Sequence, residues 1–118
     1  KYIESHEWLL DLGNGRYRVG LTDFAQHALG DIVFIDLPGV GDALSANGRL
    51  GDVESVKAVS EIESPVAGRV AAVNDELTAS PERINAAPYE AWLVEVEGVT
   101  GTPELLDAEA YRAVCERA

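Results

Sequence analysis

The chain has 118 residues, a length typical of one domain with a modest hydrophobic core. Its 21 acidic and 9 basic residues give a formal net charge of −12, which would repel phosphate backbones and anionic headgroups. We therefore expect no nucleic acid and no membrane surface as a partner, and no apolar run approaches the roughly 20 residues of a membrane span. The opening residues KYIESHEWLL match neither a secretory signal nor an Arg-rich transit pattern.

Strand-like segments separated by Gly, Asn and Pro dominate the chain. Short β-type runs between such breakers are typical of a compact sandwich or barrel. The first two runs are joined by Gly-Asn-Gly at 13–15, which predicts a hairpin. The expected strands lie within residues 2–12, 16–21, 31–38, 41–51, 52–65, 66–78 and 92–99.

A short helix is expected near 22–30, because Thr22 is a suitable N-cap, a short apolar pattern follows, and Gly30 closes the segment. The stretch TASPERINAAPYEA at 78–91 is expected to form a long loop.

A second helix is expected at the C-terminal end, over about 103–117. Thr102 is a good N-cap, and Pro103 then occupies the first helical position. The residues expected on one face of this helix are Leu105, Ala108, Tyr111 and Cys115. Cys115 is the single cysteine, which excludes an intramolecular disulfide and a CxxC zinc site, fits a reducing compartment, and predicts a small core residue.

The segment VESVKAVSE at 53–61 reads almost the same in both directions around Lys57, one of two lysines in the chain. Folded about its centre, it pairs Val56 with Val59, Ser55 with Ser60 and Glu54 with Glu61, and leaves Lys57 and Ala58 as a two-residue turn. Such turns favour Asn-Gly or Gly-X, and opposed glutamates repel. This unfavourable arrangement predicts that the lysine is displayed to a partner.

Arginine fills the other basic positions after Lys1, at Arg16, Arg18, Arg49, Arg69, Arg83, Arg112 and Arg117. An ammonium can lose its proton and attack an acyl donor to form an amide, which a guanidinium cannot readily do. Lys57 is therefore a candidate for acyl attachment. Two alternatives stay open: an ordinary solvated turn lysine, and an enzyme that uses Lys57 as a Schiff-base nucleophile in a desolvated pocket.

The segment GDVESVKAVSEIESPVAGRV at 51–70 resembles the attachment segment of the glycine cleavage system H-protein family, which carries lipoic acid as an amide on the lysine of its ESVKA motif. A biotin carrier would show Met-Lys-Met and a 2-oxo acid dehydrogenase domain Asp-Lys-Ala, whereas this chain has Val56, Lys57 and Ala58. The likeness continues in order through SHEW at 5–8, VGLTDFAQHALGDIVFIDLPGVGD at 19–42, PERINAAPY at 81–89 and LLDAEAY at 105–111. One departure is PYEAWL at 88–93, which is one residue shorter than the family's PYGxGWL.

The resemblance implies one lipoyl-carrier domain over 1–118, a mainly β fold described as a flattened β sandwich-barrel of the lipoyl/biotinyl type. It implies lipoic acid covalently bound to Lys57 and a carrier subunit, not an enzyme. The implied partners are glycine decarboxylase, which is a pyridoxal phosphate enzyme, an aminomethyltransferase, dihydrolipoamide dehydrogenase and lipoate-attaching enzymes. The carrier would move an aminomethyl group from the decarboxylase to the transferase, and electrons to the dehydrogenase.

An H-like relay protein that donates lipoate to other lipoyl domains is the alternative function. We expect a monomer located in the bacterial cytoplasm, or in the mitochondrial matrix if the source is eukaryotic.

Two sets of residues accompany Lys57 in this interpretation. Residues expected to be recognised around the attachment hairpin are Glu54, Ser55, Val56, Ala58 and Glu61. SHEW resembles the family's docking cleft for the loaded arm, so the expected docking residues are Ser5, His6, Glu7 and Glu61. In a strand Ser5 and Glu7 would share a face opposite His6, which argues against a catalytic triad. His6 and His27 lack metal-ligand spacing, so no catalytic residue and no metal ligand is expected.

Overall fold

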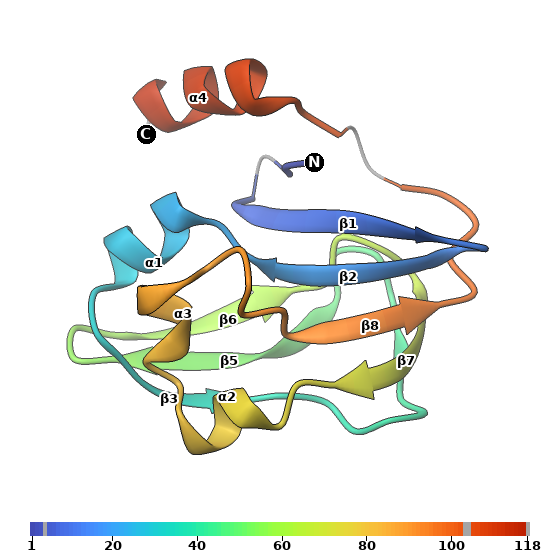
Figure 1. Ribbon diagram of the computed structural model, residues 1–118, viewed down its shortest axis with the longest axis horizontal. Helices are drawn as coiled ribbons and strands as arrows, with labels where there is room; N and C mark the ends of the chain where they lie inside the picture. The colour runs from blue at the N-terminus through green and yellow to red at the C-terminus, as the bar shows by residue number, and fades with distance from the viewer. Residues whose placement is uncertain (4, 103–104, 118) are drawn as a thin grey trace.

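The structure is a computed structural model that describes residues 1–3, 5–102 and 105–117. Eight strands and four helices follow one another in this part of the chain (Figure 1). The strands are β1 (Glu7–Gly13), β2 (Arg16–Leu21), β3 (Ile32–Asp36), β4 (Ala43–Leu44), β5 (Arg49–Ser55), β6 (Val59–Glu63), β7 (Gly68–Val73) and β8 (Val94–Glu97). The helices are α1 (Asp23–Leu29), α2 (Glu76–Ala79), α3 (Arg83–Ala86) and α4 (Ala108–Arg117).

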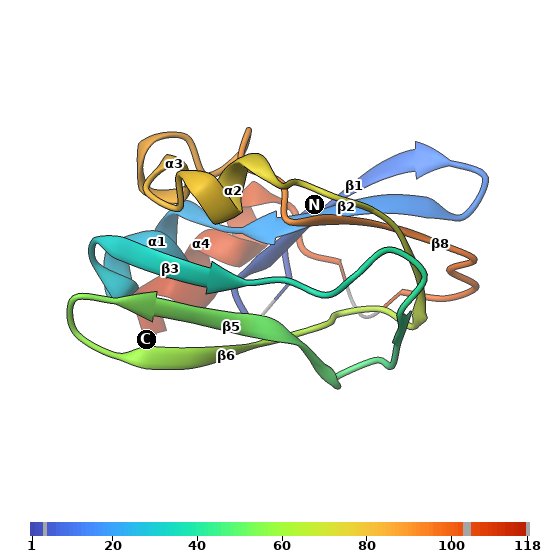
Figure 2. The same cartoon turned by 90° about the horizontal axis from the view of Figure 1, so that it is seen from below.

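Within the described residues, the strands form two antiparallel sheets. The larger sheet has the order β1-β2-β8-β7-β4, and the smaller has the order β3-β5-β6. Seen from below, the sheets lie as two layers with the helices toward one end (Figure 2). The molecule measures 35 by 33 by 22 Å along its principal axes. This flattened β sandwich with a short and a C-terminal helix confirms the predicted fold class.

Branched apolar side chains fill the space between the two sheets. Val19 and Val94 come from the larger sheet, and Ile35 and Val53 come from the smaller, and all four are essentially inaccessible to solvent. Burying a side chain of this size contributes about 1.5–3 kcal/mol. Because Val53 anchors β5 in this core, the β5–β6 hairpin projects from a rigid base.

The N-terminal hairpin turn and helix α1 confirm their predictions. Gly13, Asn14 and Gly15 have φ values of 89°, 57° and 74°, which glycine and asparagine tolerate best. Thr22 caps α1 through its side-chain oxygen, which accepts a hydrogen bond of 3.2 Å from the first turn. Gly30 ends the helix with φ of 82°.

The loop expected at 78–91 is wrong in part, because this region contains the single-turn helices α2 and α3. Leu77 and Ile84 are completely buried and draw the two turns onto the end of the sandwich. A single turn has too few residues for an apolar period to be visible in the sequence.

The C-terminal helix begins later than predicted, at Ala108. Residues 103–104, at its predicted start, lie outside the described residues. Leu106 instead forms a β-bridge with Tyr2, with hydrogen bonds of 2.8 and 3.0 Å. Asp107 then caps the helix, since its carboxylate accepts a 2.8 Å hydrogen bond from the amide of Ala110.

Candidate functional site

The β5–β6 hairpin carries the lysine, but its register differs from the predicted one by two residues. Glu54 pairs with Val59, Val53 with Ser60, and Asp52 with Glu61. Val56 and Lys57 therefore form the tip, and not Lys57 and Ala58. The predicted contact between Glu54 and Glu61 is wrong, because each faces a different residue across the hairpin.

The tip is held by Ser55 and by a neighbouring loop. The Ser55 hydroxyl accepts hydrogen bonds of 3.2 Å from the amides of Lys57 and Ala58, and the Ser55 amide donates to the Ala58 carbonyl at 2.8 Å. The Val56 amide donates to the Asp31 carbonyl at 3.0 Å. Among the described non-glycine residues, positive φ occurs at His6, Asn14 and Asn47, none of them at the tip. The turn is therefore not strained, which corrects the argument that its residues are a poor choice.

Lys57 is exposed, and its aliphatic stem lies against Gly30. A Cβ atom added at Gly30 would stand 3.0 Å from Cε of Lys57. Asn85 fixes this part of the chain: its side chain donates to the Gly30 carbonyl and accepts from the Ile32 amide, each at 2.9 Å. A Schiff-base nucleophile requires a desolvated amine, whereas Lys57 is exposed at the hairpin tip. The structure therefore does not favour that use of Lys57.

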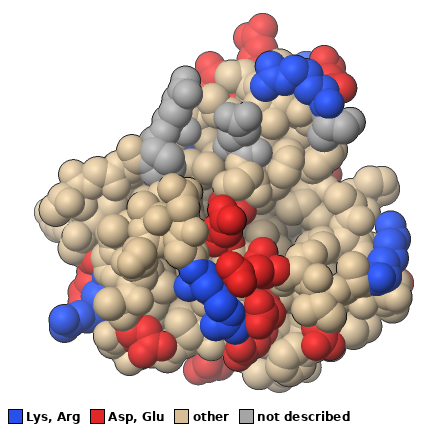
Figure 3. Space-filling model, turned by 180° about the vertical axis from the view of Figure 1, so that it is seen from behind, with Lys and Arg blue, Asp and Glu red and all other residues tan. Residues whose placement is uncertain are grey.

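A cleft of about 270 Å³ lies between the N-terminal segment, helix α1 and the β5–β6 hairpin. It brings together all four residues of the predicted docking set. The lining residues are Ser5, His6, Glu7, Leu21, Phe24, Ala25, Ala28, Leu29, Val53, Ser60, Glu61 and Ile62. Seen from behind, the molecule has acidic side chains gathered beside a hollow (Figure 3).

Glu7 is the carboxylate inside this cleft, and its side chain is only 4% exposed. Burial raises its pKa from 4.5 to about 7, opposed by the Ser5 hydrogen bond and assisted by the negative charge of Glu63. The Ser5 hydroxyl donates to Oε1 of Glu7 at 2.6 Å. Among the described residues no Lys or Arg forms an ion pair with Glu7. A buried carboxyl group of this kind, in a cleft, is typical of a functional site.

Ser5 and Glu7 were expected to share one face of a strand, but a turn brings them together. Strand β1 begins at Glu7, and the His6 amide donates to the Ile3 carbonyl at 2.9 Å. His6 has φ of 72°, an unfavourable value for a residue with a side chain. The turn places Ser5 and Glu7 within hydrogen-bond distance while the His6 ring also lines the cleft.

Comparison with known proteins shows the family of this chain. The family model described as Glycine cleavage H-protein matches residues 1–118. The chain belongs to this family. It is 50% identical over 119 residues to the glycine cleavage system H protein of Sodalis glossinidius, covering 98% of this chain and 91% of that protein. It is 52% identical over 113 residues to the H protein of Nitratidesulfovibrio vulgaris, covering 94% and 87%.

The fold of this H-protein family member also matches a solved structure. The crystal structure of a glycine cleavage system H protein from Mycobacterium marinum has a TM-score of 0.87 and 40% sequence identity, and the match covers 95% of this chain and 92% of that one. The match to this solved structure therefore extends over nearly the whole chain.

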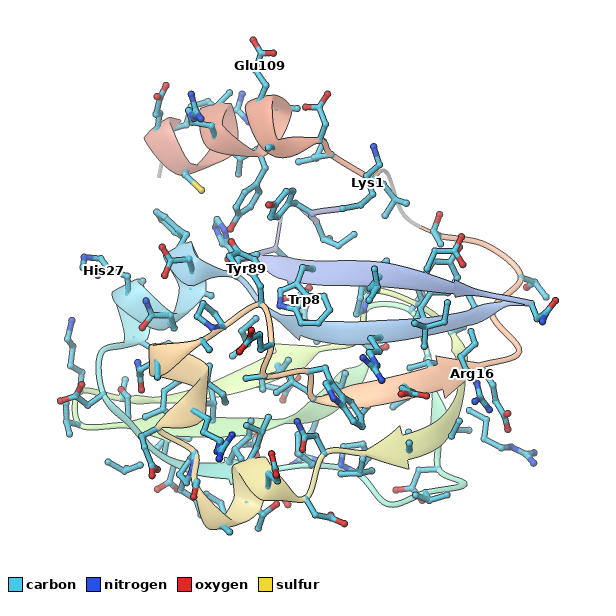
Figure 4. The ribbon with its side chains drawn as sticks, in the orientation of Figure 1. Lys1, Trp8, Arg16, His27, Tyr89 and Glu109 are labelled. Atoms are coloured by element: carbon cyan, nitrogen blue, oxygen red, sulfur yellow. The ribbon has the colours of Figure 1, made fainter. Side chains whose placement is uncertain are left out.

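The PYEAWL segment at 88–93 is anchored to β1 in this family member. The indole nitrogen of Trp8 donates to the Pro88 carbonyl at 3.0 Å, and the Trp8 ring lies 6.5 Å from the Tyr89 ring (Figure 4). The Tyr89 hydroxyl accepts a 3.1 Å hydrogen bond from the Asp23 amide at the start of α1. The loop therefore connects β1 to one wall of the cleft.

Tyr111 of helix α4 supports the cleft and was not predicted as part of the site. Its hydroxyl lies 2.7 Å from Nδ1 of His6 and 2.5 Å from the hydroxyl of Thr22, the α1 cap. The His6 ring also stacks on Phe24 at 4.5 Å. The one signal available in the sequence was a hydroxyl on the apolar face of a helix, since a buried tyrosine hydroxyl requires a hydrogen-bond partner.

The remaining residues considered in the sequence are His27 and Cys115. His27 is exposed and points outward from α1 (Figure 4). No group of three or more His, Cys, Asp or Glu residues in the described chain could hold a metal ion. Within the same residues, no helix has the length and apolar character needed to cross a membrane. Cys115 is a free thiol on α4 and is half-buried, so the prediction of a core residue is wrong for this position.

Glu7 predicts an unusual dependence of stability on pH. Because its folded pKa is about 7 and its ordinary value is 4.5, the unfolded chain loses this proton first as pH rises. The Glu7 contribution to the free energy of unfolding is therefore full below pH 4.5 and lost by about pH 7, a change of about 3 kcal/mol. We expect Glu7→Gln to be more stable than the wild type at pH 8 by up to this amount.

Urea unfolding between pH 4 and pH 8 measures this difference. Glutamine keeps the shape and an oxygen that can accept the Ser5 hydrogen bond, so the variant isolates the charge. Glu109→Gln is the matched control, because Glu109 is exposed on α4. If Glu7→Gln and the wild type lost stability in parallel over this range, Glu7 would not be the group that is held protonated.

Proposed function

We propose that the protein is the lipoyl-bearing carrier of the glycine cleavage system. In this proposal Lys57 holds lipoic acid as an amide, and the protein is a carrier subunit rather than an enzyme. The observation that carries the proposal is the pairing of an exposed lysine at the tip of a fixed hairpin with a cleft that contains a buried carboxyl group. Family membership supports the same assignment.

When attached, the lipoyl group supplies a dithiolane that accepts a one-carbon aminomethyl group and, later, electrons. Residues of the chain itself hold the lipoyl arm and shield the aminomethyl group from water. Lys57 carries the arm, and its side chain lies beside Gly30 at the end of helix α1. Ala28 and Leu29 of the same helix line the cleft. Phe24, Leu29 and Val53 supply apolar walls, and these exclude water from a docked group.

Glu7 is the group that recognises the amine of the cargo in this proposal. A carboxylate in a poorly solvated cleft attracts an ammonium group strongly, and the ammonium in turn lowers the pKa of the carboxyl. Ser5 orients Glu7 through its 2.6 Å hydrogen bond, while Glu61 adds negative charge at the rim. His6 holds the turn through Tyr111.

The partners in this proposal are glycine decarboxylase, the aminomethyltransferase, dihydrolipoamide dehydrogenase and a lipoate-attaching enzyme. Around the hairpin, the attaching enzyme would contact Glu54, Ser55, Val56, Ala58 and Glu61. The net charge of −12 favours partner surfaces that are basic. The relatives described above are bacterial, which favours the cytoplasm over the mitochondrial matrix.

The test is acylation followed by reconstitution. The protein is incubated with a lipoate-attaching enzyme, lipoate and ATP, and intact mass with peptide mapping is expected to find one adduct on Lys57. The modified protein is then expected to support ammonia release from glycine with the three partner enzymes and tetrahydrofolate. An adduct confined to Lys1 would contradict the proposal, and lipoate transfer to other lipoyl domains without ammonia release would favour the relay alternative.

A further inference from the structure

Three of the apolar side chains that stand exposed near the lysine tip are Phe34 of β3, Val56 of the tip and Val59 of β6. Their exposed fractions are 47%, 67% and 67%. Phe34 pairs with Glu54, and Glu54 pairs with Val59, so Phe34 and Val59 lie on the same outer face of the smaller sheet. We call Phe34, Val56 and Val59 the tip patch.

The rest of this outer face is charged. Asp52 and Glu61 lie opposite each other farther along the hairpin, and Asp36 lies opposite Asp52 on the other side. In the view from behind, acidic side chains accordingly gather toward the middle of this face (Figure 3). The apolar side chains are therefore concentrated at the end of the sheet that carries Lys57. A cluster of exposed apolar residues beside a reactive group, rimmed by charge, is typical of an interaction site.

The distance between Nζ of Lys57 and the atom on which each enzyme acts indicates which partner covers the tip patch. An enzyme that acylates Lys57 must bring its acyl donor to bonding distance of Nζ, so its surface closes over the residues beside the lysine. An enzyme that acts on the far end of an attached acyl arm meets its target a whole arm's length away and has no such requirement. The tip patch therefore fits the acylating enzyme.

We propose that the tip patch, Phe34, Val56 and Val59, is the docking surface for the enzyme that attaches the lipoyl group to Lys57. The proposal rests on the proposed function and adds to it that recognition extends across the sheet to β3 and β6, outside the motif around the lysine. In this proposal the partner enzyme has an apolar surface that contacts Phe34 and Val59. Basic residues beside that surface face Glu54 and Glu61.

The step that the docked enzyme performs is acyl transfer from an activated carboxylic acid. The bond between the acyl carbon and its leaving group breaks, and the leaving group departs with the electron pair. The amide bond forms between the acyl carbon and Nζ of Lys57, and the ammonium gives up two of its three protons to solvent or to a base of the enzyme while the amide keeps the third. No oxidation or reduction takes place.

The experiment measures initial rates of lipoyl transfer to the full, unmodified chain by a purified lipoate-attaching enzyme with lipoate and ATP. Phe34→Ser and Val59→Ser are compared with Val40→Ser, a matched control that has similar exposure, 68%, and lies beyond the far end of β3. We expect each patch variant to lower kcat/KM by about tenfold, mainly through KM, because a buried valine or phenylalanine contributes at least that much to binding. Val40→Ser should stay within about twofold of the wild type.

Two further readouts separate docking from other effects. A small activated ester, N-hydroxysuccinimidyl acetate, needs no protein surface, so peptide mapping should find equal acetylation of Lys57 in all variants. The double variant Glu54→Gln and Glu61→Gln should weaken the salt dependence of enzymatic transfer, whereas the patch variants should leave it unchanged.

Transfer to Phe34→Ser and Val59→Ser at the Val40→Ser rate would overturn the docking proposal. An equal loss of reactivity toward the small ester would also overturn it, because the patch would then act on the lysine itself. If the wild-type chain accepted no lipoyl group at all, the proposed function would fail together with this proposal, a result distinct from the first two.

Discussion

Lys57→Arg is expected to abolish lipoyl attachment and every reaction that depends on it, while the fold stays intact. Arginine keeps the positive charge, but its guanidinium does not lose a proton readily enough to form an amide. The tip conformation depends on Ser55 and on the Asp31 carbonyl, neither of which requires the lysine amine. Ammonia release from glycine in the reconstituted system should therefore fall to the background rate, with an unchanged unfolding midpoint.

Lys1→Arg is the matched control for this variant. It removes the other lysine and leaves the hairpin untouched, so it should gain the full lipoyl mass and support wild-type turnover. A Lys57→Arg protein that still gained the mass, on Lys1 or elsewhere, would show that the hairpin lysine is not the attachment site.

The hairpin shows why its register could not be predicted although its existence could. A shift of two residues keeps every side chain on its original face, because the side-chain period of a strand is two. Val53 points into the core in either register, so the apolar pattern does not distinguish them. The Ser55 side chain and the contact with the Asp31 carbonyl select the observed register, and the second of these depends on the tertiary fold.

The cleft, too, could be predicted from the sequence only in part. The SHEW segment and the hairpin could be named from the sequence, and the structure does bring Ser5, Glu7 and Glu61 together. The turn at His6 and its support by Tyr111 could not be predicted, because that contact joins residues 105 positions apart. The start of α4 was misplaced for the same reason, since Leu106, expected in the helix, forms a β-bridge with Tyr2.

In the proposed function, the charge of Glu7 binds the carried amine at a cost to the stability of the free protein. Its ionised form is unfavourable in the free protein, because burial withdraws the carboxylate from water while no cation lies against it in the described residues. An ammonium group brought by the carried arm would relieve this cost. The cleft is therefore suited to a cationic amine and less suited to a neutral group.

Glu7→Gln is expected to shorten the lifetime of the carried aminomethyl group. An aminomethyl sulfide decomposes when the lone pair of its nitrogen expels the thiolate, and only the neutral amine has that lone pair. A carboxylate beside the amine raises the pKa of the amine, and each pKa unit lowers the neutral fraction about tenfold. Replacing Glu7 by Gln should therefore increase spontaneous release of formaldehyde and ammonia by about tenfold at pH 7.5 to 8.

The measurement loads wild-type and variant proteins with the aminomethyl group and follows release without the transferase across pH. Glu61→Gln should have a smaller effect, because Glu61 lies exposed at the rim, and the double variant should be at least as fast as Glu7→Gln. Glu109→Gln is the control, because Glu109 points away from the body of the molecule (Figure 4). The ratio of the Glu7→Gln release rate to the wild-type rate should narrow at high pH, where the amine is neutral with or without a neighbouring carboxylate. Equal release rates at every pH in both single variants and the double would show that these carboxylates do not protect the cargo.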